Sequence, residues 1–168
     1  MPVPIPHLVP LGLGLGWAAV SDLRRRRIPN AITGFVLVSG LVVTALDGGL
    51  LNPLSGLAAL VLVVLVLCRP WVVGGIGGGD VKLAAATAVW VGLAGLPWFA
   101  LATALSGGVV ALVCFAVAGK AARADMRANL TLAVVHGELP AVPSHKTHVS
   151  VPYAVAILAG AVVVFFVV

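Results

Sequence analysis

Residues 83–119 read LAAATAVWVGLAGLPWFALATALSGGVVALVCFAVAG, a stretch without a single charged side chain. A helix that crosses a bilayer takes about 20 residues, so this stretch is too long for one crossing and fits two. Pro97, in Gly95-Leu96-Pro97, cannot donate a helical hydrogen bond, and we expect the helix to break there. The stretch therefore predicts a pair of membrane-spanning helices.

The rest of the chain has the same character. Of its 168 residues 61% are hydrophobic and only 9% are charged, whereas soluble domains carry about 25% charged residues. So few charges cannot give a chain of this size a solvated surface, and composition alone predicts an integral membrane protein. The length leaves no room for a folded domain outside the membrane. We therefore expect one all-α, membrane-embedded domain over residues 1–168.

Four further apolar stretches bring the predicted number of membrane-spanning helices to six. They cover about residues 8–21, 31–46, 50–68 and 151–168. Asp22 and the arginines after it end the first stretch, and Arg69-Pro70 ends the third. The polar segment 119–150 joins the fifth helix to the last. Within it, residues 119–135 form either an interfacial helix or a solvated loop, because Lys120, Arg123 and Arg127 are spaced along one helical face.

The basic residues predict how the helices are oriented. All ten lysines and arginines fall within residues 22–30, 69–82 and 119–150, which lie on one side if six spans alternate. The positive-inside rule makes that side cytoplasmic and leaves both termini outside the cell. The protein is thus expected in the plasma or inner membrane. Such a rim attracts anionic lipid headgroups, at about 1 kcal/mol per residue. The net charge of +5 is thus a membrane signal, and no nucleic-acid partner is expected.

Two of the five acidic residues stand out. Asp22 and Asp80 each lie at the cytoplasmic end of a predicted span, where an ionisable group is costly unless it is paired, hydrated or used. Structural roles also fit, because arginines follow Asp22 and a carboxylate at a helix N-terminus is favoured by the dipole. Position alone leaves both readings open. The other three acidic residues are expected to be solvated surface charges: Asp47, Asp125 and Glu138.

The neighbours of the two aspartates favour function. Asp80 follows a run of glycines that permits close backbone approach, so Gly77, Gly78, Gly79 and Lys82 are predicted to form a loop facing an extended substrate. Lys82 alternatively anchors this loop to lipid phosphate, which we favour. After Asp22, Pro29 and Asn30 form a structural turn that starts the second helix. The glycine run lacks the lysine and hydroxyl residue of a nucleotide-binding loop.

Together these residues resemble the type IV prepilin peptidases, membrane aspartyl proteases with a Gly-x-Gly-Asp motif. The resemblance rests on Asp22 with Ile28-Pro29-Asn30 after it and on Gly77-Gly78-Gly79-Asp80-Val81-Lys82-Leu83. Residues 151–160 are similar to the proline-containing C-terminal segment of the family. The resemblance implies that Asp22 and Asp80 are the catalytic pair. It also implies cleavage of a basic leader peptide from a prepilin or pseudopilin, typically after a glycine, at the cytoplasmic membrane face.

The chemistry of such a pair is physically reasonable. Two carboxylates at close range do not both ionise cheaply, so the pKa of one rises and the pair holds one proton. The ionised group takes a proton from water, and the protonated group donates a hydrogen bond to the scissile carbonyl. Because such a pair titrates as a unit, the sequence does not assign which aspartate is the base.

The chain also departs from the larger family members, which carry paired CxxC motifs and an N-methyltransferase activity. It begins directly with an apolar span and has no CxxC motif, so it is more similar to the short, peptidase-only members associated with Tad/Flp-type pili. An archaeal-type preflagellin peptidase is also compatible with the motifs. We expect neither methylation nor zinc.

No metal or cofactor is predicted. Cys68 and Cys114 stand alone in apolar runs, and His145 and His148 have no third ligand nearby. The main alternative function is a small transporter or channel in which the glycine run is a broken helix lining a path. The charged positions count against it, because they lie at one rim and not at the bilayer midplane. The sequence does not indicate the oligomeric state.

Overall fold

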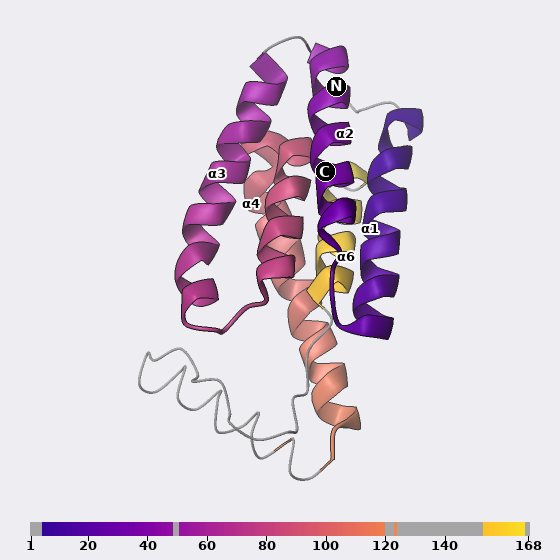
Figure 1. Ribbon diagram of the computed structural model, residues 1–168, viewed down its shortest axis with the longest axis vertical. Coiled ribbons are helices and arrows are strands. Elements are labelled where there is room, and N and C mark those ends of the chain that lie inside the picture. Colours follow the sequence, from indigo (N-terminus) through magenta and orange to yellow (C-terminus); the bar gives the residue numbers. More distant parts are fainter. Residues whose placement is uncertain (1–4, 49–50, 120–122, 124–152, 167–168) are drawn as a thin grey trace.

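The computed structural model describes residues 5–48, 51–119, 123 and 153–166, and all the elements in these ranges are helices (Figure 1). The predicted all-α class is thus confirmed for this part of the chain. The elements are α1 (Ile5–Arg25), α2 (Asn30–Gly48), α3 (Leu51–Val72), α4 (Gly78–Val117) and α6 (Tyr153–Phe166). The predicted interfacial helix, Asp125, Glu138, His145 and His148 lie outside the described residues.

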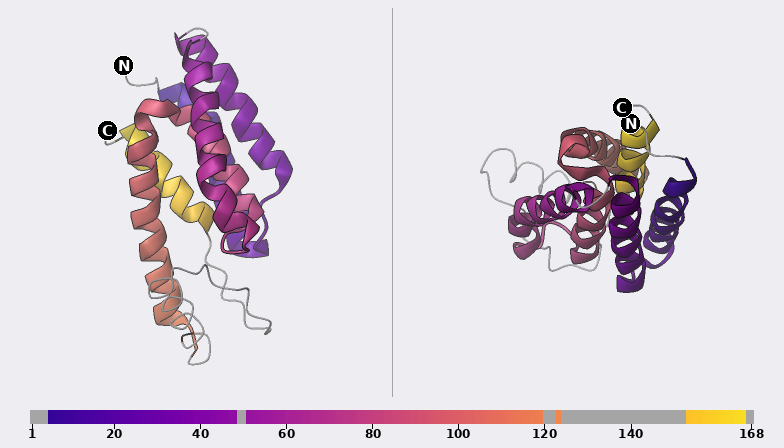
Figure 2. Two further views of the ribbon diagram at one scale, coloured as in Figure 1. Left: turned by 90° about the vertical axis from the view of Figure 1, so that its left-hand side faces the viewer. Right: turned by 90° about the horizontal axis from the view of Figure 1, so that it is seen from above.

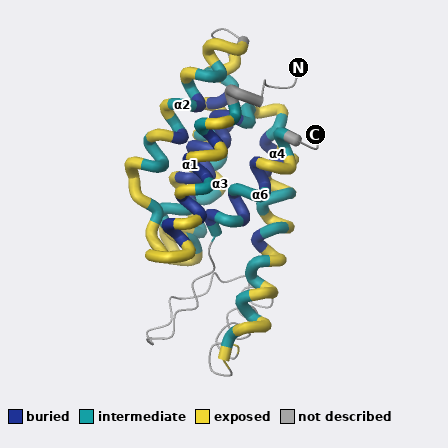
Figure 3. The backbone as a smooth tube through the Cα atoms, turned by 90° about the vertical axis from the view of Figure 1, so that its right-hand side faces the viewer, coloured by how far each residue is buried: buried dark blue, intermediate teal, exposed yellow. Residues whose placement is uncertain are grey.

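The first half of α4 is the centre of the bundle. It packs against α2 and α3, and α4 also contacts α6. Nearly every residue from Val81 to Trp90 is buried, and the buried residues of the chain gather inside the bundle (Figure 3). α1 packs against α2 and lies antiparallel to α6, since Leu8 and Phe165 line one cavity and the Ala154 N–H bonds Asp22. Successive helices alternate in direction (Figures 1 and 2).

The long apolar stretch breaks into two helical arms, as predicted, but the break lies at Gly92, three residues before the predicted Gly95-Leu96-Pro97. Gly92 has φ 66° and ψ 178°, a conformation open to glycine but costly for other residues. Ser55 of α3 accepts a hydrogen bond from the Leu93 N–H over 3.1 Å, which satisfies a backbone group freed by the break. Pro97 lies inside the helix that follows. We call residues 78–91 the first arm of α4 and residues 93–117 its second arm, which runs back beside the bundle (Figure 2).

Two other helix ends differ from the prediction. α1 continues through Asp22 to Arg25, and α3 continues through Arg69-Pro70 to Val72. Pro70 removes one helical hydrogen bond near the end of α3, where few turns remain to be disturbed. α3 is ended instead by Gly74, whose φ of 79° turns the chain so that the Gly75 N–H bonds the Pro70 carbonyl over 2.8 Å.

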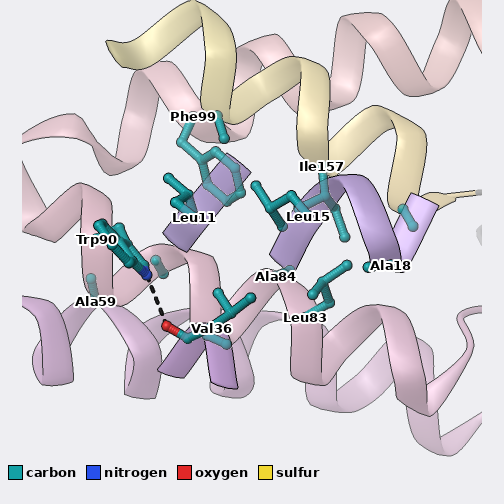
Figure 4. Packing of buried hydrophobic residues seen from close by; sticks show 14 of the residues in the cluster. Leu11, Leu15, Ala18, Val36, Ala59, Leu83, Ala84, Trp90, Phe99 and Ile157 are labelled. Carbon is teal, nitrogen blue, oxygen red and sulfur yellow. Dashed lines mark hydrogen bonds between the residues drawn. The ribbon is translucent and has the colours of Figure 1, made fainter. Parts of the chain in front are cut away.

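Small residues let the helices approach closely in the core. The indole N–H of Trp90, on the first arm, donates a hydrogen bond to the Val36 carbonyl of α2 over 2.8 Å (Figure 4). A Cβ on Gly40 would lie 2.6 Å from Nε1 of that indole, so only glycine leaves room for it. Close approach at small residues is typical of helix packing in membranes.

The outer surface of the bundle is apolar. Large side chains such as Trp17, Leu46 and Leu112 are about 70% exposed or more. Soluble proteins rarely expose apolar side chains over so large an area. α2, α3 and α4 are each long and apolar enough to cross a bilayer. The structure is therefore that of a membrane protein, with the charged ends of α1 and α3 at one end of the bundle (Figure 1).

Candidate active site

Asp22 is held by three segments. It lies on the last turns of α1 and is only 8% exposed. Its Oδ2 accepts a hydrogen bond from the backbone N–H of Ala154, in the first turn of α6, over 3.3 Å. The hydroxyl of Ser21, beside it, donates to the Arg27 carbonyl over 2.8 Å and folds the α1–α2 turn back against α1. A helix N-terminus is a favourable partner for a carboxylate, so Asp22 has a fixed place.

Asp80 lies in the first turn of α4. Gly77 precedes the helix and its carbonyl accepts the Asp80 N–H over 3.1 Å. The carboxylate folds back over Gly77, so that a Cβ on this glycine would lie 2.8 Å from Oδ2 of Asp80. Gly79 faces Ile28, at 3.3 Å from where its Cβ would stand. The glycines therefore bring the start of α4 against the turn that follows Asp22.

The two aspartates line one cleft of about 650 Å³. It lies between the end of α1, the glycine turn, the start of α4 and the start of α6. The other lining residues are Arg26, Arg27, Ile28, Gly74, Gly75, Ile76, Gly77, Gly78, Gly79, Gly107, Ala111 and Tyr153.

This arrangement has the elements that water-activating carboxylate pairs need. Two acids from separate helices face the same space, and the glycine backbone supplies part of its wall without filling it with side chains. The volume is several times the roughly 30 Å³ that one water molecule takes in the liquid. A peptide strand and a water molecule can therefore both reach the carboxylates.

The predicted substrate loop is divided by the structure. Gly77, Gly78 and Gly79 line the cleft, but Gly78 and Gly79 already belong to α4. Lys82 lies two residues beyond Asp80 on the same helix, about 200° around its axis. It donates from Nζ to Oδ1 of Asn30 over 3.3 Å and lines another cavity, between α2, α3 and α4.

The turn after α1 has the form that the sequence indicates. α2 begins at Asn30, and the carbonyl of Pro29 accepts the N–H of Ile32 over 3.1 Å. Asn30 thus starts α2 and, through Lys82, ties it to α4. Neither Pro29 nor Asn30 lines the cleft of the aspartates.

Sequence reasoning missed the contribution of α6. Tyr153 lines the cleft, and its hydroxyl lies 3.4 Å from where a Cβ on Gly107 would stand. Tyr153 is the single tyrosine of the chain, and its place at the start of the last apolar stretch was the available signal. The sequence carries no signal for Ala154, because this residue acts through its backbone N–H.

The residues that the structure describes contain no group of three His, Cys, Asp or Glu side chains that could hold a metal ion. Cys68 and Cys114 are half-buried free thiols, on α3 and on the second arm of α4. Neither lines the cleft.

Comparison with known proteins identifies a family for the chain. Comparisons with curated proteins and with solved structures gave no match. The model of the type IV leader peptidase family matches residues 10–112, most of the chain and the part that holds both Asp22 and Asp80. Its peptidase activity suits a cleft lined by two carboxylates. By this match, the chain belongs to the type IV leader peptidase family.

Proposed function

We propose that this membrane peptidase is an aspartyl endopeptidase in which Asp22 and Asp80 are the catalytic pair. The observation that carries the proposal is their meeting in one cleft, although they come from different helices and distant parts of the sequence. The family match supports the peptidase activity, and it implies a substrate of the prepilin type. We propose a prepilin or pseudopilin with a basic leader before an apolar helix.

The mechanism follows from the two carboxyl groups. The ionised aspartate takes a proton from a water molecule, whose oxygen attacks the scissile carbonyl carbon. The protonated aspartate gives its proton to the carbonyl oxygen as the tetrahedral intermediate forms. When the C–N bond breaks, the leaving amine takes a proton from the first aspartate, and the gem-diol returns a proton to the second. The pair thus starts and ends with one proton between its members.

Substitution of each aspartate by asparagine tests the proposal. Asn keeps the size of the side chain but cannot exchange a proton, so Asp22→Asn and Asp80→Asn should each lower cleavage by about 10²–10⁴-fold. Both variants should still insert and accumulate. The assay is conversion of a co-expressed prepilin, normalised to the amount of enzyme.

Asp47→Asn is the matched control, because Asp47 is an exposed aspartate at the far end of α2. It should cleave within a few-fold of wild type. Substantial processing by well-expressed Asp22→Asn or Asp80→Asn would exclude the aspartyl mechanism. A transporter would not show this pattern.

We also propose that the protein lies in the plasma membrane of a bacterial or archaeal cell, with the cleft on the cytoplasmic side. Support comes from the arginines in the last turns of α1 and α3, at the end of the bundle where the cleft lies, and from the positive-inside rule. Six spans would then place both termini outside.

Cysteine labelling tests this orientation. With Cys68 and Cys114 replaced by serine, Asp47→Cys in intact cells should react with a membrane-impermeant thiol reagent. Arg24→Cys, also exposed but at the other end of the bundle, should react only after the cells are opened. The reverse pattern would contradict the proposed orientation.

A further inference from the structure

A second cavity of about 300 Å³ adjoins the catalytic cleft. Ile76, Asp80 and Tyr153 line both spaces, so the two adjoin at the Asp80 carboxylate. The remaining walls come from α3, both arms of α4 and α6, and they are almost entirely apolar. They consist of Leu62, Val63, Val66, Leu67, Ala84, Leu96, Phe99, Ala100, Thr103, Ala104 and Ile157. We call this cavity the lateral groove.

The lateral groove opens sideways to the lipid. On α3 its rim carries Leu62 and Val66, and on the second arm of α4 it carries Ala100 and Ala104; all four are exposed. In each pair the residues are four apart and so lie on one helix face. The groove follows the second arm from Leu96 to Ala104, about 12 Å at the helical rise per residue. It therefore leads from the bilayer to Asp80.

The charges of the cleft indicate which part of a substrate the lateral groove receives. Arg26 and Arg27 line the cleft together with Asp22 and Asp80, so the formal charges of the cleft balance and give a basic leader no net attraction. The affinity for such a substrate has to come from its apolar part. The groove offers an apolar surface that begins at Asp80, where the scissile bond must lie.

The dimensions agree with a short apolar segment. A cavity of about 150 Å³ binds benzene in a protein core, so the lateral groove has room for roughly two large side chains. The alanines on its rim let another helix approach closely, as small residues do in membrane helix pairs. A whole membrane-spanning helix does not fit into this volume, but two large side chains from its first turn do.

We propose that the lateral groove binds the apolar residues that directly follow the scissile bond, so that the substrate helix enters sideways between α3 and the second arm of α4. This rests on the proposed endopeptidase function. The groove then sets the register of the substrate: once the first apolar turn is seated, the preceding peptide bond lies at Asp80. Ala100 and Ala104 become specificity-determining residues.

Cross-linking tests the position of the substrate without relying on cleavage. The enzyme carries Asp22→Asn, Cys68→Ser and Cys114→Ser, with one new cysteine, at Ala104 or at Ala116. The probe is a synthetic prepilin with a basic leader, a glycine and an apolar helix of about 20 residues, with one cysteine just after the glycine. Ala116 is exposed on the same arm but lies outside the groove.

A disulfide to the probe should form at least tenfold faster for Ala104→Cys than for Ala116→Cys. Equal rates would overturn the proposal. The proposal would also be overturned if no disulfide to the probe formed because an acyl chain or another segment of this chain covers the cysteine at position 104.

Filling the lateral groove gives an independent readout. Two substrates are compared: the full probe and a soluble peptide that ends two residues after the glycine. Ala104→Leu should lower the ratio of the cleavage rate of the full probe to that of the soluble peptide at least tenfold. Ala116→Leu is the control for a larger side chain on this arm and should leave the ratio within twofold. A probe with alanines at the first four positions after the glycine should restore the ratio in Ala104→Leu.

These measurements test the endopeptidase function and the docking role of the lateral groove separately. If wild-type enzyme cleaves neither substrate, the proposed function is wrong. If wild type cleaves both and Ala104→Leu leaves the ratio unchanged, the endopeptidase stands and the lateral groove is not the docking site.

Discussion

Asp80 and Trp90 lie on the same arm of α4, yet their surroundings differ. Around Trp90 the helices touch: its indole bonds the Val36 carbonyl and fills the space that a side chain at position 40 would take. Around Asp80 the helices diverge and leave a cleft of about 650 Å³. Glycine serves both places, by closing a gap between helices at position 40 and by leaving the carboxylate room at position 77.

The difference shows how one helix does two jobs. The buried part of the arm fixes the position of α4 within the bundle, because close-packed interiors do not deform continuously. The half-buried start of the arm, from Gly78 to Asp80, then presents Asp80 to the cleft at a defined place. A change in the packed part should therefore act on stability, and a change in the open part should act on cleavage.

Gly77→Ala tests the open region around Asp80. Gly77 has an ordinary φ of −66°, so alanine is not strained there, but its Cβ would lie 2.8 Å from Oδ2 of Asp80. The carboxylate must shift, and a misplacement of this order costs about 10²-fold in rate. Cleavage of prepilin per enzyme molecule should fall by that factor with little loss of protein.

Gly108→Ala is the control for that substitution, because its Cβ meets nothing within 4 Å, and it should cleave as wild type does. Wild-type cleavage by Gly77→Ala would show that the position of the Asp80 carboxylate is not critical.

The second, smaller effect is on stability. Gly40→Ala places a Cβ against the Trp90 indole and displaces its hydrogen bond to Val36. Overpacking of this kind costs about 1–3 kcal/mol, to be measured as the free energy of unfolding in detergent. Gly12→Ala, on an open face of α1, should leave stability equal or slightly higher. Equal stabilities for the two variants would contradict the packed character of this region.

The sequence predicts the helical class well because hydrophobic runs and charge clusters are local signals. It misplaces the break in α4 because the decisive features are not local. Pro97 is visible in the sequence, but the backbone turns at Gly92, where Ser55 from another helix supplies the missing hydrogen bond. Likewise Gly74, and not Pro70, ends α3.

The sequence singles out the two aspartates as candidate site residues because ionisable groups at the ends of apolar spans are rare and costly. Lys82 was grouped with them because it is near in sequence. Once α4 begins at Gly78, however, the helical repeat turns Lys82 away from Asp80 and toward Asn30. The contribution of Ala154 depends on a backbone N–H and on tertiary contact, which no residue pattern encodes.

A double-mutant cycle tests whether Asp22 and Asp80 act as one catalytic unit. Cleavage rates are measured for Asp22→Asn, Asp80→Asn and the variant with both changes, at matched enzyme levels. If the two groups share one proton, either single change already destroys the unit, and the double variant should be within a few-fold of the slower single variant. Losses that multiply, with the double variant slower by the product of the two factors, would show that the aspartates act independently and would contradict the account.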